Sequence, residues 1–295
     1  MALLLCAAAL SGSAALGQSL SIIKSGESNY WIEASAPAGN PHTLRASGNL
    51  HLWIDIHNDL QESFSSEFES AGVSQRYFRL IPSTPPPPPI RVLLLGDSMT
   101  ADCCGWGRGI YGYFKPNATV INYAAPWTST KVFLQSAELN KMLLIKPDYV
   151  LIQYGFMEAS ADPDRSTTME EFAANLKTIV QMVRGFNGVP ILITLHAARV
   201  WDDQGKLLPS WTTQNNVVKQ VAAELKTPLI DLFQLTYDAF SELGPNGVGF
   251  MEYAADDFMH LSPLGGQFVS RLVVNALPDP LGPYLTGILD LPPKS

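Results

Sequence analysis

The chain has 295 residues, 46% of them hydrophobic, which is enough to build one sizeable packed domain and a smaller one. Its formal net charge at pH 7 is -8 and it has no basic block to neutralise phosphate groups, which argues against a nucleic-acid partner. No stretch of about 18 consecutive apolar residues follows the N-terminus, so we expect no membrane partner either.

Residues 1–17 have the composition of an export signal, a short apolar run that ends in small residues before Gln18. The run is too short to span a membrane, and it lacks the early lysine or arginine that most signals carry. We therefore expect cleavage after Gly17 and a secreted protein, either extracellular or periplasmic. Cys6 would leave with the signal.

Residues 18–82 predict a small all-β module. Three alternating runs, TLRAS, HLWIDIH and QRYFRLIP, are separated by glycine, asparagine and proline, and helix signals are few. Five consecutive prolines then favour a stiff spacer at residues 83–89. A second domain is expected over residues 90–280, followed by a C-terminal tail at residues 281–295.

The second domain opens on the stretch RVLLLGDSMT. Arg91 to Leu95 predict a buried parallel strand, and Gly96-Asp97-Ser98 predict a tight turn at its carboxyl end, where open α/β sheets bind their ligands. A serine hydroxyl is a poor nucleophile unless a base accepts its proton, so Ser98 needs a histidine and an orienting acid. Asp97 is expected to order the turn.

Strand and helix patterns then alternate along the chain. Strands are expected at 119–123, 149–154, 190–195 and 228–231, and helices at 129–146, 168–184, 212–226 and 263–276. Thr168 and Glu171 form a capping box at the start of the second of these helices. Alternation at this spacing predicts a parallel sheet that is covered by helices on both faces.

An acid and a histidine stand near the end of this domain. Asp257 precedes His260 by three residues, and the segment that follows has the signals of a helix start. On one short loop the carboxylate can hold the imidazole while the other ring nitrogen reaches Ser98, which predicts a triad of Ser98, His260 and Asp257. The alternative is that Gly-Asp-Ser is an ordinary turn and Asp-x-x-His a surface loop.

These motifs and their order resemble the SGNH or GDSL-type hydrolase superfamily, with particular similarity to secreted rhamnogalacturonan acetylesterase-like carbohydrate esterases. The matching pieces are GDSMT at Gly96, GWGRG at Gly105, INYAA at Ile121, DYVLIQYG at Asp148 and DDFMHLSPLGG at Asp256. The resemblance runs from about Ile90 to Leu277. It implies a flavodoxin-like, doubly wound parallel sheet and a serine esterase that uses neither metal nor cofactor.

The resemblance also implies a set of oxyanion donors, and the chain departs from the family at two of them. The family has a glycine after the second strand where this chain has Trp127, and an asparagine after the third strand where it has Met157. The N–H groups of Ser98 and Trp127 are the expected remaining donors, provided that the turn at Trp127 needs no positive φ. Because a methionine side chain donates no hydrogen bond, we expect slow turnover or a donor from elsewhere.

Four side chains are candidates for substrate binding. Trp127 and Phe156 would make an apolar mouth, and His196 and Arg199 follow the fourth strand at the same sheet edge. The alternative for the two aromatic residues is that they only fill their loops. His196 ranks behind His260 as a general base because no acid stands at the family's spacing.

Cys103 and Cys104 come soon after the turn Gly96-Asp97-Ser98, which we call the nucleophile turn. An adjacent pair cannot join distant elements, so the chain has no disulfide framework and its stability must come from packing. One interpretation of the pair is a ring-forming vicinal disulfide. The other, which we favour, is two reduced and partly buried thiols.

Three functions remain open. The first is a secreted serine esterase that deacetylates carbohydrate, with a pectin-type polysaccharide or oligosaccharide as the substrate that the resemblance suggests. The second is a broad esterase for small short-chain or aryl esters, which an apolar mouth would suit. The third is a non-catalytic carbohydrate-binding protein on an inactivated hydrolase scaffold, which the complete triad argues against.

Overall fold

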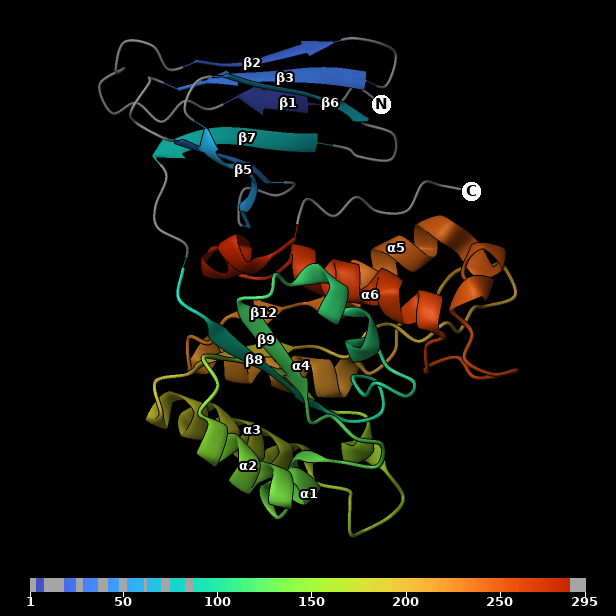
Figure 1. The fold of residues 1–295 in the computed structure, drawn as a ribbon. Helices are drawn as coiled ribbons and strands as arrows, with labels where there is room; N and C mark the ends of the chain where they lie inside the picture. The colour runs from blue at the N-terminus through green and yellow to red at the C-terminus, as the bar shows by residue number, and fades with distance from the viewer. Residues whose placement is uncertain are drawn as a thin grey trace. The chain divides into compact units, whose positions relative to one another are not determined.

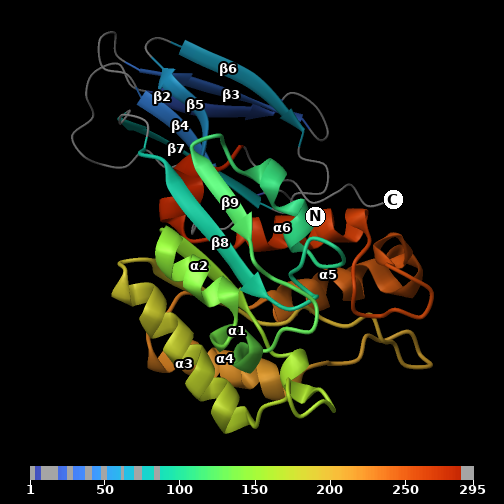
Figure 2. The ribbon, with the colours of Figure 1, turned by 60° about the horizontal axis from the view of Figure 1, so that its bottom comes forward.

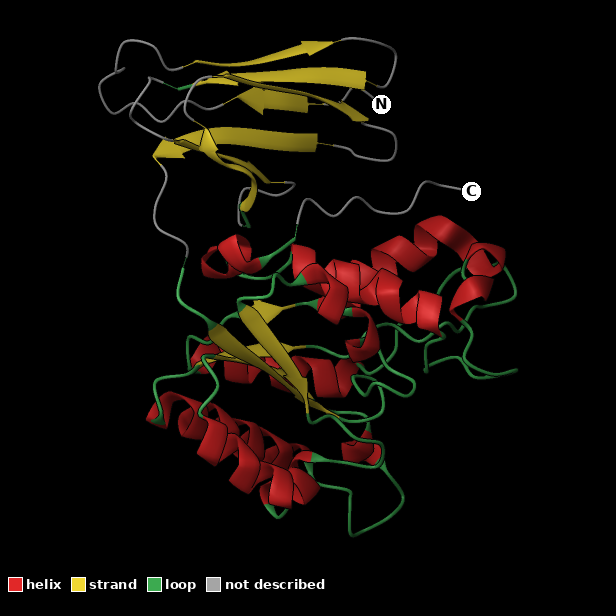
Figure 3. Cartoon of the chain, in the orientation of Figure 1, coloured by secondary structure: helices red, strands yellow, loops and turns green. Residues whose placement is uncertain are grey.

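The computed structural model describes residues 4–7, 19–24, 29–36, 42–47, 52–60, 63–69, 75–82 and 87–286. The chain divides into two compact units, one made of Met1–Pro88 with Asn275–Ser295 and the other of Pro89–Val274. Figure 1 shows the path of the chain, and Figure 3 distinguishes its helices from its strands by colour. The described residues therefore fall into a β-rich unit and a larger α/β unit.

The β-rich unit contains two small sheets. One is antiparallel with the order β2-β3-β6, formed by β2 (Ser19–Lys24), β3 (Asn29–Ser35) and β6 (Ser63–Glu69). The other has the order β1-β7-β4-β5, formed by β1 (Leu4–Ala7), β7 (Gln75–Pro82), β4 (His42–Ser47) and β5 (Ile54–Leu60). Apolar side chains from both sheets, among them Ile32, Leu44 and Phe78, pack into one cluster. The predicted small β module is confirmed.

The N-terminal leader that the sequence predicts lies mostly outside the described residues. Of residues 1–17 only Leu4–Ala7 are described, as the strand that pairs with β7 in parallel register. Residues 83–86 of the proline-rich spacer and residues 287–295 of the predicted tail also lie outside the described part. Cleavage of the leader stays a prediction.

The end of the chain belongs to the β-rich unit, whereas the sequence places residues up to 280 in the second domain. The 3₁₀ helix η5 (Asp279–Tyr284) is held there by ion pairs of Asp279 with Arg45 and Arg79 and by further hydrogen bonds. Asp279 Oδ1 accepts one from the N–H of Trp53 (3.0 Å), and the Tyr284 hydroxyl donates one to the carbonyl of Pro88 (3.0 Å). Local sequence patterns hold no signal for such long-range contacts, so the predicted boundary at residue 280 could not take them into account.

The α/β unit is built on a five-stranded sheet in which every neighbouring pair is parallel. The strands are β8 (Ile90–Gly96), β9 (Ala118–Asn122), β10 (Tyr149–Gln153), β11 (Val189–Ile193) and β12 (Leu229–Ile230). Their spatial order, β12-β11-β10-β8-β9, is that of flavodoxin-like doubly wound folds, so the predicted fold class is confirmed. The order reverses between β8 and β10, and the end of β8 therefore lies where such sheets bind ligands.

Helices cover both faces of this sheet. One face carries α1 (Thr130–Leu134), α2 (Ala137–Ile145), α3 (Met169–Gly185) and α4 (Thr212–Glu224), whose apolar side chains share a core with strand residues such as Leu93 and Ile152. On the opposite face lie α5 (Leu232–Gly247) and α6 (Pro263–Asn275) (Figures 1 and 2). The predicted capping box, Thr168 with Glu171, is present at the start of α3. Within the described residues, no helix combines the length and apolar character needed to cross a bilayer.

Two helices differ from the sequence prediction. The predicted helix at 129–146 is divided into α1 and α2 because the Ser136 hydroxyl donates a hydrogen bond to the carbonyl of Phe133 (2.8 Å) and accepts one from the N–H of Leu139 (3.4 Å). These are the contacts of an N-cap, so Ser136 starts a new helix. The sequence did not predict α5, which contains a kink at Gly244 and Pro245 that interrupts the helical pattern.

Candidate active site

Ser98 stands in a tight turn at the carboxyl end of β8, and only 6% of its surface is exposed. A hydrogen bond from Thr100 N–H to the carbonyl of Asp97 (3.1 Å) closes the turn. The Asp97 carboxylate accepts a second hydrogen bond from the N–H of Met99 (2.9 Å). Gly96 permits this sharp exit from the strand, since a Cβ there would lie 2.7 Å from a carbonyl oxygen of β10. Asp97 thus orders the turn, as its position predicts.

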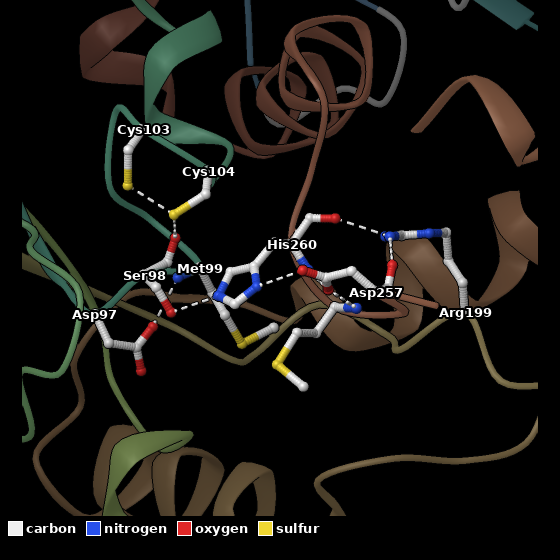
Figure 4. Close-up of polar contacts among 9 residues, drawn as sticks. Asp97, Ser98, Met99, Cys103, Cys104, Arg199, Asp257 and His260 are labelled. Carbon is white, nitrogen blue, oxygen red and sulfur yellow. Dashed lines mark hydrogen bonds and ion pairs between the residues drawn. The ribbon is translucent and has the colours of Figure 1, made fainter. Parts of the chain in front are cut away.

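The structure brings Ser98, His260 and Asp257 together (Figure 4). His260 Nε2 lies 2.8 Å from Ser98 Oγ, and His260 Nδ1 lies 2.8 Å from Asp257 Oδ2. Because an ionised carboxylate only accepts hydrogen bonds, Nδ1 carries the proton and Nε2 is left free to accept the hydrogen of the serine hydroxyl. The two motifs are therefore joined in one hydrogen-bonded chain, in the order that nucleophilic catalysis by serine requires.

The loop that carries His260 is held by its own acid and by Arg199. Asp257 Oδ1 accepts hydrogen bonds from the N–H groups of Met259 (3.1 Å) and His260 (2.9 Å), so one carboxylate orders the loop and also orients the imidazole. Arg199 Nη2 donates to the carbonyls of Asp257 and His260, both at 2.8 Å. Figure 4 shows Arg199 beside this loop. The position of the imidazole therefore depends on main-chain contacts that the Asp-x-x-His motif alone does not reveal.

Electrostatics keep Asp257 ionised. Desolvation by burial raises the pKa of this carboxyl, but the N–H groups of His260 and Met259 and the imidazole of His260 outweigh that effect, and the pKa lies below its usual value. The Asp257 carboxylate is therefore charged at neutral pH and can accept the hydrogen bond from His260 Nδ1.

Gln153 is a site residue that sequence reasoning missed. Its side chain is fully buried at the end of β10, where Oε1 accepts hydrogen bonds from Thr100 Oγ1 (2.6 Å) and Trp106 Nε1 (2.8 Å). Its Nε2 donates to the carbonyl of Thr194 (2.8 Å), which directly follows β11. One amide at the end of β10 therefore links the turn after β8 to the end of β11. The available signal was a single polar residue in an otherwise apolar strand, because a buried amide is kept only where its hydrogen bonds are satisfied.

Two predicted substrate contacts, His196 and Arg199, are not supported by their positions. The His196 side chain is completely buried, and its Nδ1 lies 3.0 Å from the carbonyl of Ala197. Burial lowers the pKa of His196 to about 4, so the ring is neutral at neutral pH. Arg199 is only 8% exposed and its guanidinium donates to the His260 loop. Burial leaves neither side chain at the surface, and we interpret Arg199 as a positioning residue.

Buried acids lie directly behind the nucleophile turn. Desolvation raises the pKa of Asp97 to about 7, and the charge of Glu158 adds to this effect, although the N–H groups of Met99, Phe156 and Met157 oppose it. Burial also raises the pKa of Glu158, against the hydrogen bond that its Oε1 accepts from the N–H of Thr130 (2.7 Å). The pair therefore carries less than two negative charges at neutral pH.

These shifts predict opposite pH dependences of stability for two variants. The contribution of Asp97, whose pKa rises from 3.8 to about 7, is complete below pH 3.8 and is lost as the pH rises through 7. The contribution of His196, whose pKa falls from 6.5 to about 4, is complete above pH 6.5 and is lost as the pH falls through 4. Each amounts to a few kcal/mol, since a difference of one in pKa corresponds to about 1.4 kcal/mol.

Thermal unfolding between pH 4 and pH 8 measures both contributions. Without the histidine, His196→Asn should lose stability steadily as the pH rises, because Asp97 and Glu158 are then unopposed. In contrast, Asp97→Asn keeps the histidine and loses one of the two acids, so its stability should rise relative to that of His196→Asn between pH 4 and about pH 6.5. Parallel pH profiles for the two variants would contradict the assigned shifts.

Comparisons with known proteins identify the family of this chain. Residues 94–268, more than half of the chain, match the model of the GDSL-like Lipase/Acylhydrolase family, and the matched part includes Ser98, Asp257 and His260. The chain belongs to this family. It is therefore an acylhydrolase of the esterase type by descent, and the resemblance seen in its motifs is confirmed.

Two curated proteins that this chain resembles in sequence are esterases. The chain is 26% identical over 210 residues to rhamnogalacturonan acetylesterase RhgT of Bacillus subtilis (strain 168), a match that covers 64% of this chain and 90% of the relative. It is 28% identical over 204 residues to the human isoamyl acetate-hydrolyzing esterase 1 homolog, covering 61% of this chain and 77% of the relative. The two named activities differ in their substrates, but both break an ester bond.

Solved structures share the fold. The YXIM_BACsu protein of Bacillus subtilis superposes with a TM-score of 0.57 at 20% identity, covering 85% of this chain and 77% of its own. The acetylxylan esterase Axe2 of Geobacillus stearothermophilus superposes with a TM-score of 0.51 at 18% identity, covering 65% of this chain and 96% of its own. At these identities the matches support the fold and carry no information on substrate.

Trp127, where the resemblance predicts a glycine, adopts the left-handed conformation with φ +67°. The sequence predicts that a tryptophan is tolerated here only if the turn needs no positive φ, and the turn does need one. A non-glycine residue in this conformation lowers the free energy of unfolding by about 1 kcal/mol. Among the described residues, no protein acceptor takes the N–H of Trp127 or that of Ser98. The Trp127 ring is 66% exposed, and the guanidinium carbon of Arg165 lies 5.6 Å from its centroid.

Met157, at the position of the family's asparagine, is 3% exposed and lies in the short 3₁₀ helix η3 (Met157–Ala159). The N–H groups of Met157 and Phe156 face the Asp97 carboxylate, so they do not replace the lost side-chain donor. Phe156 packs edge-on against Trp211, with ring centroids 5.2 Å apart. The family's third oxyanion donor is therefore missing from this loop.

The structure offers no candidate metal centre within its described residues, since no group of three or more histidine, cysteine or carboxylate side chains is gathered there. Apart from η3 and η5, the described residues also form the short 3₁₀ helices η1 (Gly107–Gly109), η2 (Tyr111–Tyr113) and η4 (Gly249–Met251), which hold no such group either.

Proposed function

We propose that the protein is a secreted serine esterase that removes acetyl groups from carbohydrate. The observation that carries this proposal is the hydrogen-bonded chain from Ser98 Oγ through His260 to Asp257, with both contacts at 2.8 Å. Serine, histidine and an ionised acid in this order activate a hydroxyl for attack on an ester carbonyl. Membership of the acylhydrolase family supports the same reaction.

In the first half of the reaction, Ser98 Oγ attacks the carbonyl carbon of the ester while His260 Nε2 accepts the hydroxyl proton. The free N–H groups of Ser98 and Trp127 stabilise the oxyanion of the tetrahedral intermediate. When the intermediate collapses, the sugar hydroxyl leaves with the proton from Nε2, and the acetyl group stays on Ser98. A water molecule then gives its proton to Nε2 and attacks the acetyl carbonyl, which releases acetate and returns the proton to Ser98.

Carbohydrate is the substrate class that the relatives and the exposed aromatic ring favour. RhgT is named for rhamnogalacturonan, and a second B. subtilis relative, 29% identical, is named as a probable rhamnogalacturonan acetylesterase. Trp127 presents its ring at the surface in the segment that follows β9, and a flat indole suits stacking on a pyranose face. The broader esterase is the second candidate, because the human relative is named for isoamyl acetate hydrolysis.

A substrate panel distinguishes these functions. Acetate release would be compared for acetylated rhamnogalacturonan, acetylated xylan, isoamyl acetate and p-nitrophenyl acetate. The proposal expects the highest kcat/KM on an acetylated carbohydrate. A higher value on both small esters would support the broad esterase. No turnover by the wild type, with carbohydrate bound equally well by Ser98→Ala, would identify a binding protein instead.

Trp127→Asn isolates the role of the ring. Asparagine tolerates a positive φ and keeps the main-chain N–H, so the substitution removes only the aromatic surface. We expect KM for an acetylated oligosaccharide to rise about tenfold or more, since stacking on an aromatic ring is worth about 1–3 kcal/mol, while p-nitrophenyl acetate turnover stays unchanged. Equal effects on both substrates would show that Trp127 shapes the oxyanion turn and does not bind sugar.

Met157→Asn restores the family's missing side-chain donor. Loss of such a donor typically costs about 10² to 10³ in turnover, so we expect kcat to rise about tenfold or more with little change in KM. Met157→Leu is the matched control, because it keeps an apolar side chain of similar volume and adds no donor. A gain in both variants, or in neither, would contradict a depleted oxyanion site.

Secretion is part of the proposal and is tested separately. The motivating observation is the apolar, small-residue composition of residues 1–17. Expression with these residues in a host that exports proteins, followed by N-terminal sequencing of the protein outside the cytoplasm, should yield a chain that begins at Gln18. A chain retained in the cytoplasm with its N-terminus intact would rule export out.

A further inference from the structure

The two adjacent cysteines lie beside the nucleophile turn with their sulfur atoms almost in bonding contact. Cys103 Sγ and Cys104 Sγ are 2.6 Å apart, Cys103 is exposed and Cys104 is buried (Figure 4). A disulfide bond is about 2.05 Å long, so the sulfur atoms need only a small further approach. Both cysteines are free thiols in this structure. The side chains are therefore already arranged for oxidation.

Cys104 contacts both halves of the candidate site. Its thiol is placed to donate a weak hydrogen bond to the carbonyl of Ser98 (3.5 Å), and its own carbonyl accepts a hydrogen bond from the N–H of Leu261 (2.7 Å). Leu261 directly follows His260 in the chain. A change in the conformation of Cys104 would therefore act on the nucleophile and on the base together.

We propose that Cys103 and Cys104 form a redox modification site that takes a small-molecule disulfide as oxidant and slows the enzyme reversibly when the two sulfurs are joined. The geometry that carries this proposal is the sulfur contact together with the two main-chain links from Cys104 to Ser98 and Leu261. The effect on turnover rests on the proposed esterase function, whereas the modification itself does not.

The reaction proceeds by thiol–disulfide exchange. The exposed Cys103 thiolate attacks one sulfur of the oxidant and expels the other half as a thiolate. Cys104 then loses its proton and attacks Cys103 Sγ, which expels the second thiolate, so the two cysteines are oxidised as the external disulfide is reduced to two thiols. Burial, with the contact to Cys103, raises the pKa of Cys104 to about 12, which favours Cys103 as the thiol that starts the exchange.

A disulfide between adjacent residues is strained. Consecutive Cα atoms are about 3.8 Å apart, which is shorter than the roughly 4.4–6.8 Å that disulfides usually span. Strained disulfides are more readily reduced, and this is typical of regulatory bonds. Closing the ring also removes the S–H donor to the Ser98 carbonyl and draws Cys104 toward Cys103. The Ser98 Oγ to His260 Nε2 contact is then no longer supported in its present geometry.

The test uses the full chain with Cys6→Ser, so that Cys103 and Cys104 are its only cysteines. The protein is equilibrated with oxidised and reduced glutathione in varied ratio, and its intact mass and p-nitrophenyl acetate turnover are measured together. We expect a mass loss equal to two hydrogen atoms and a fall in kcat of about tenfold or more, since a displacement of about 1 Å costs on the order of 10² in rate. Dithiothreitol should restore both values.

Adding Cys103→Ser to this background gives the matched control. It should keep the turnover of the reduced protein in every redox buffer, because the exposed thiol is absent. Addition of one glutathione to each cysteine, without a joined pair, would overturn the modification site. A joined pair with unchanged turnover would overturn the link to Ser98 and His260. If the reduced protein hydrolyses no ester, the esterase proposal fails, and the mass measurement still decides the modification.

Discussion

Ser98→Ala is expected to lower kcat/KM on any ester by at least about 10⁴-fold, because no other atom in the turn can replace Oγ as the nucleophile. The folded structure should be unaffected. Ser98 is 6% exposed, and its side chain has one hydrogen-bond partner, His260 Nε2, so alanine removes one contact and leaves no large cavity. Initial rates with p-nitrophenyl acetate measure the loss of kcat/KM. Thermal unfolding of the same variant shows whether its stability has changed.

Ser241→Ala is the matched control for this substitution. Ser241 is an exposed serine of α5, and the change should leave both kcat/KM and the unfolding temperature unaltered. A loss of activity in both variants would point to a preparation artefact. Full activity in Ser98→Ala would remove the proposed mechanism altogether, since Oγ is its nucleophile.

The second large effect is expected from Asp257→Asn, which should reduce kcat by about 10³- to 10⁴-fold with little change in KM. The amide oxygen can still accept the N–H groups of Met259 and His260, so the loop keeps its fold. The amide nitrogen then faces His260 Nδ1 and must donate to it. Nδ1 becomes the acceptor, the proton moves to Nε2, and Nε2 can no longer accept the proton of Ser98.

Asp256→Asn provides the control for this effect. Asp256 is the exposed neighbouring acid with φ +62°, a conformation that asparagine also tolerates, so the change removes one charge from the same loop without strain. Its activity should remain within about twofold of the wild type, since exposed charges contribute little. Equal losses for the two variants would mean that the loop's charge matters and that the tautomer of His260 does not.

Much of this site was accessible from the sequence because its signals are local. An apolar strand followed by Gly-Asp-Ser, and Asp-x-x-His before a helix start, place three reactive groups at element ends whatever the rest of the chain does. The parallel sheet follows from the alternation of strand and helix patterns. The capping box at Thr168 is equally local, and all of these features are present in the structure.

Other features depend on contacts between residues far apart in the chain. His196 and Arg199 follow a strand as substrate-binding residues often do, but only packing against distant elements shows that His196 is buried and that Arg199 supports the His260 loop. The return of η5 to the β-rich unit rests on the contact between Asp279 and Trp53, residues 226 positions apart. No periodicity within either segment encodes such a pairing.

The sequence by itself predicted a parallel α/β sheet through its hydrophobic periodicity. Its short motifs carried the resemblance to the family and identified the three groups of the proposed triad, because such motifs report on the residues that contain them. Only the tertiary structure decided the geometry of those groups, the positive φ of Trp127, the amide link through Gln153 and the contacts of Cys104 with Ser98 and Leu261. These depend on how separate segments are brought together by burial and hydrogen bonding, and free energies of that kind are properties of the packed chain as a whole.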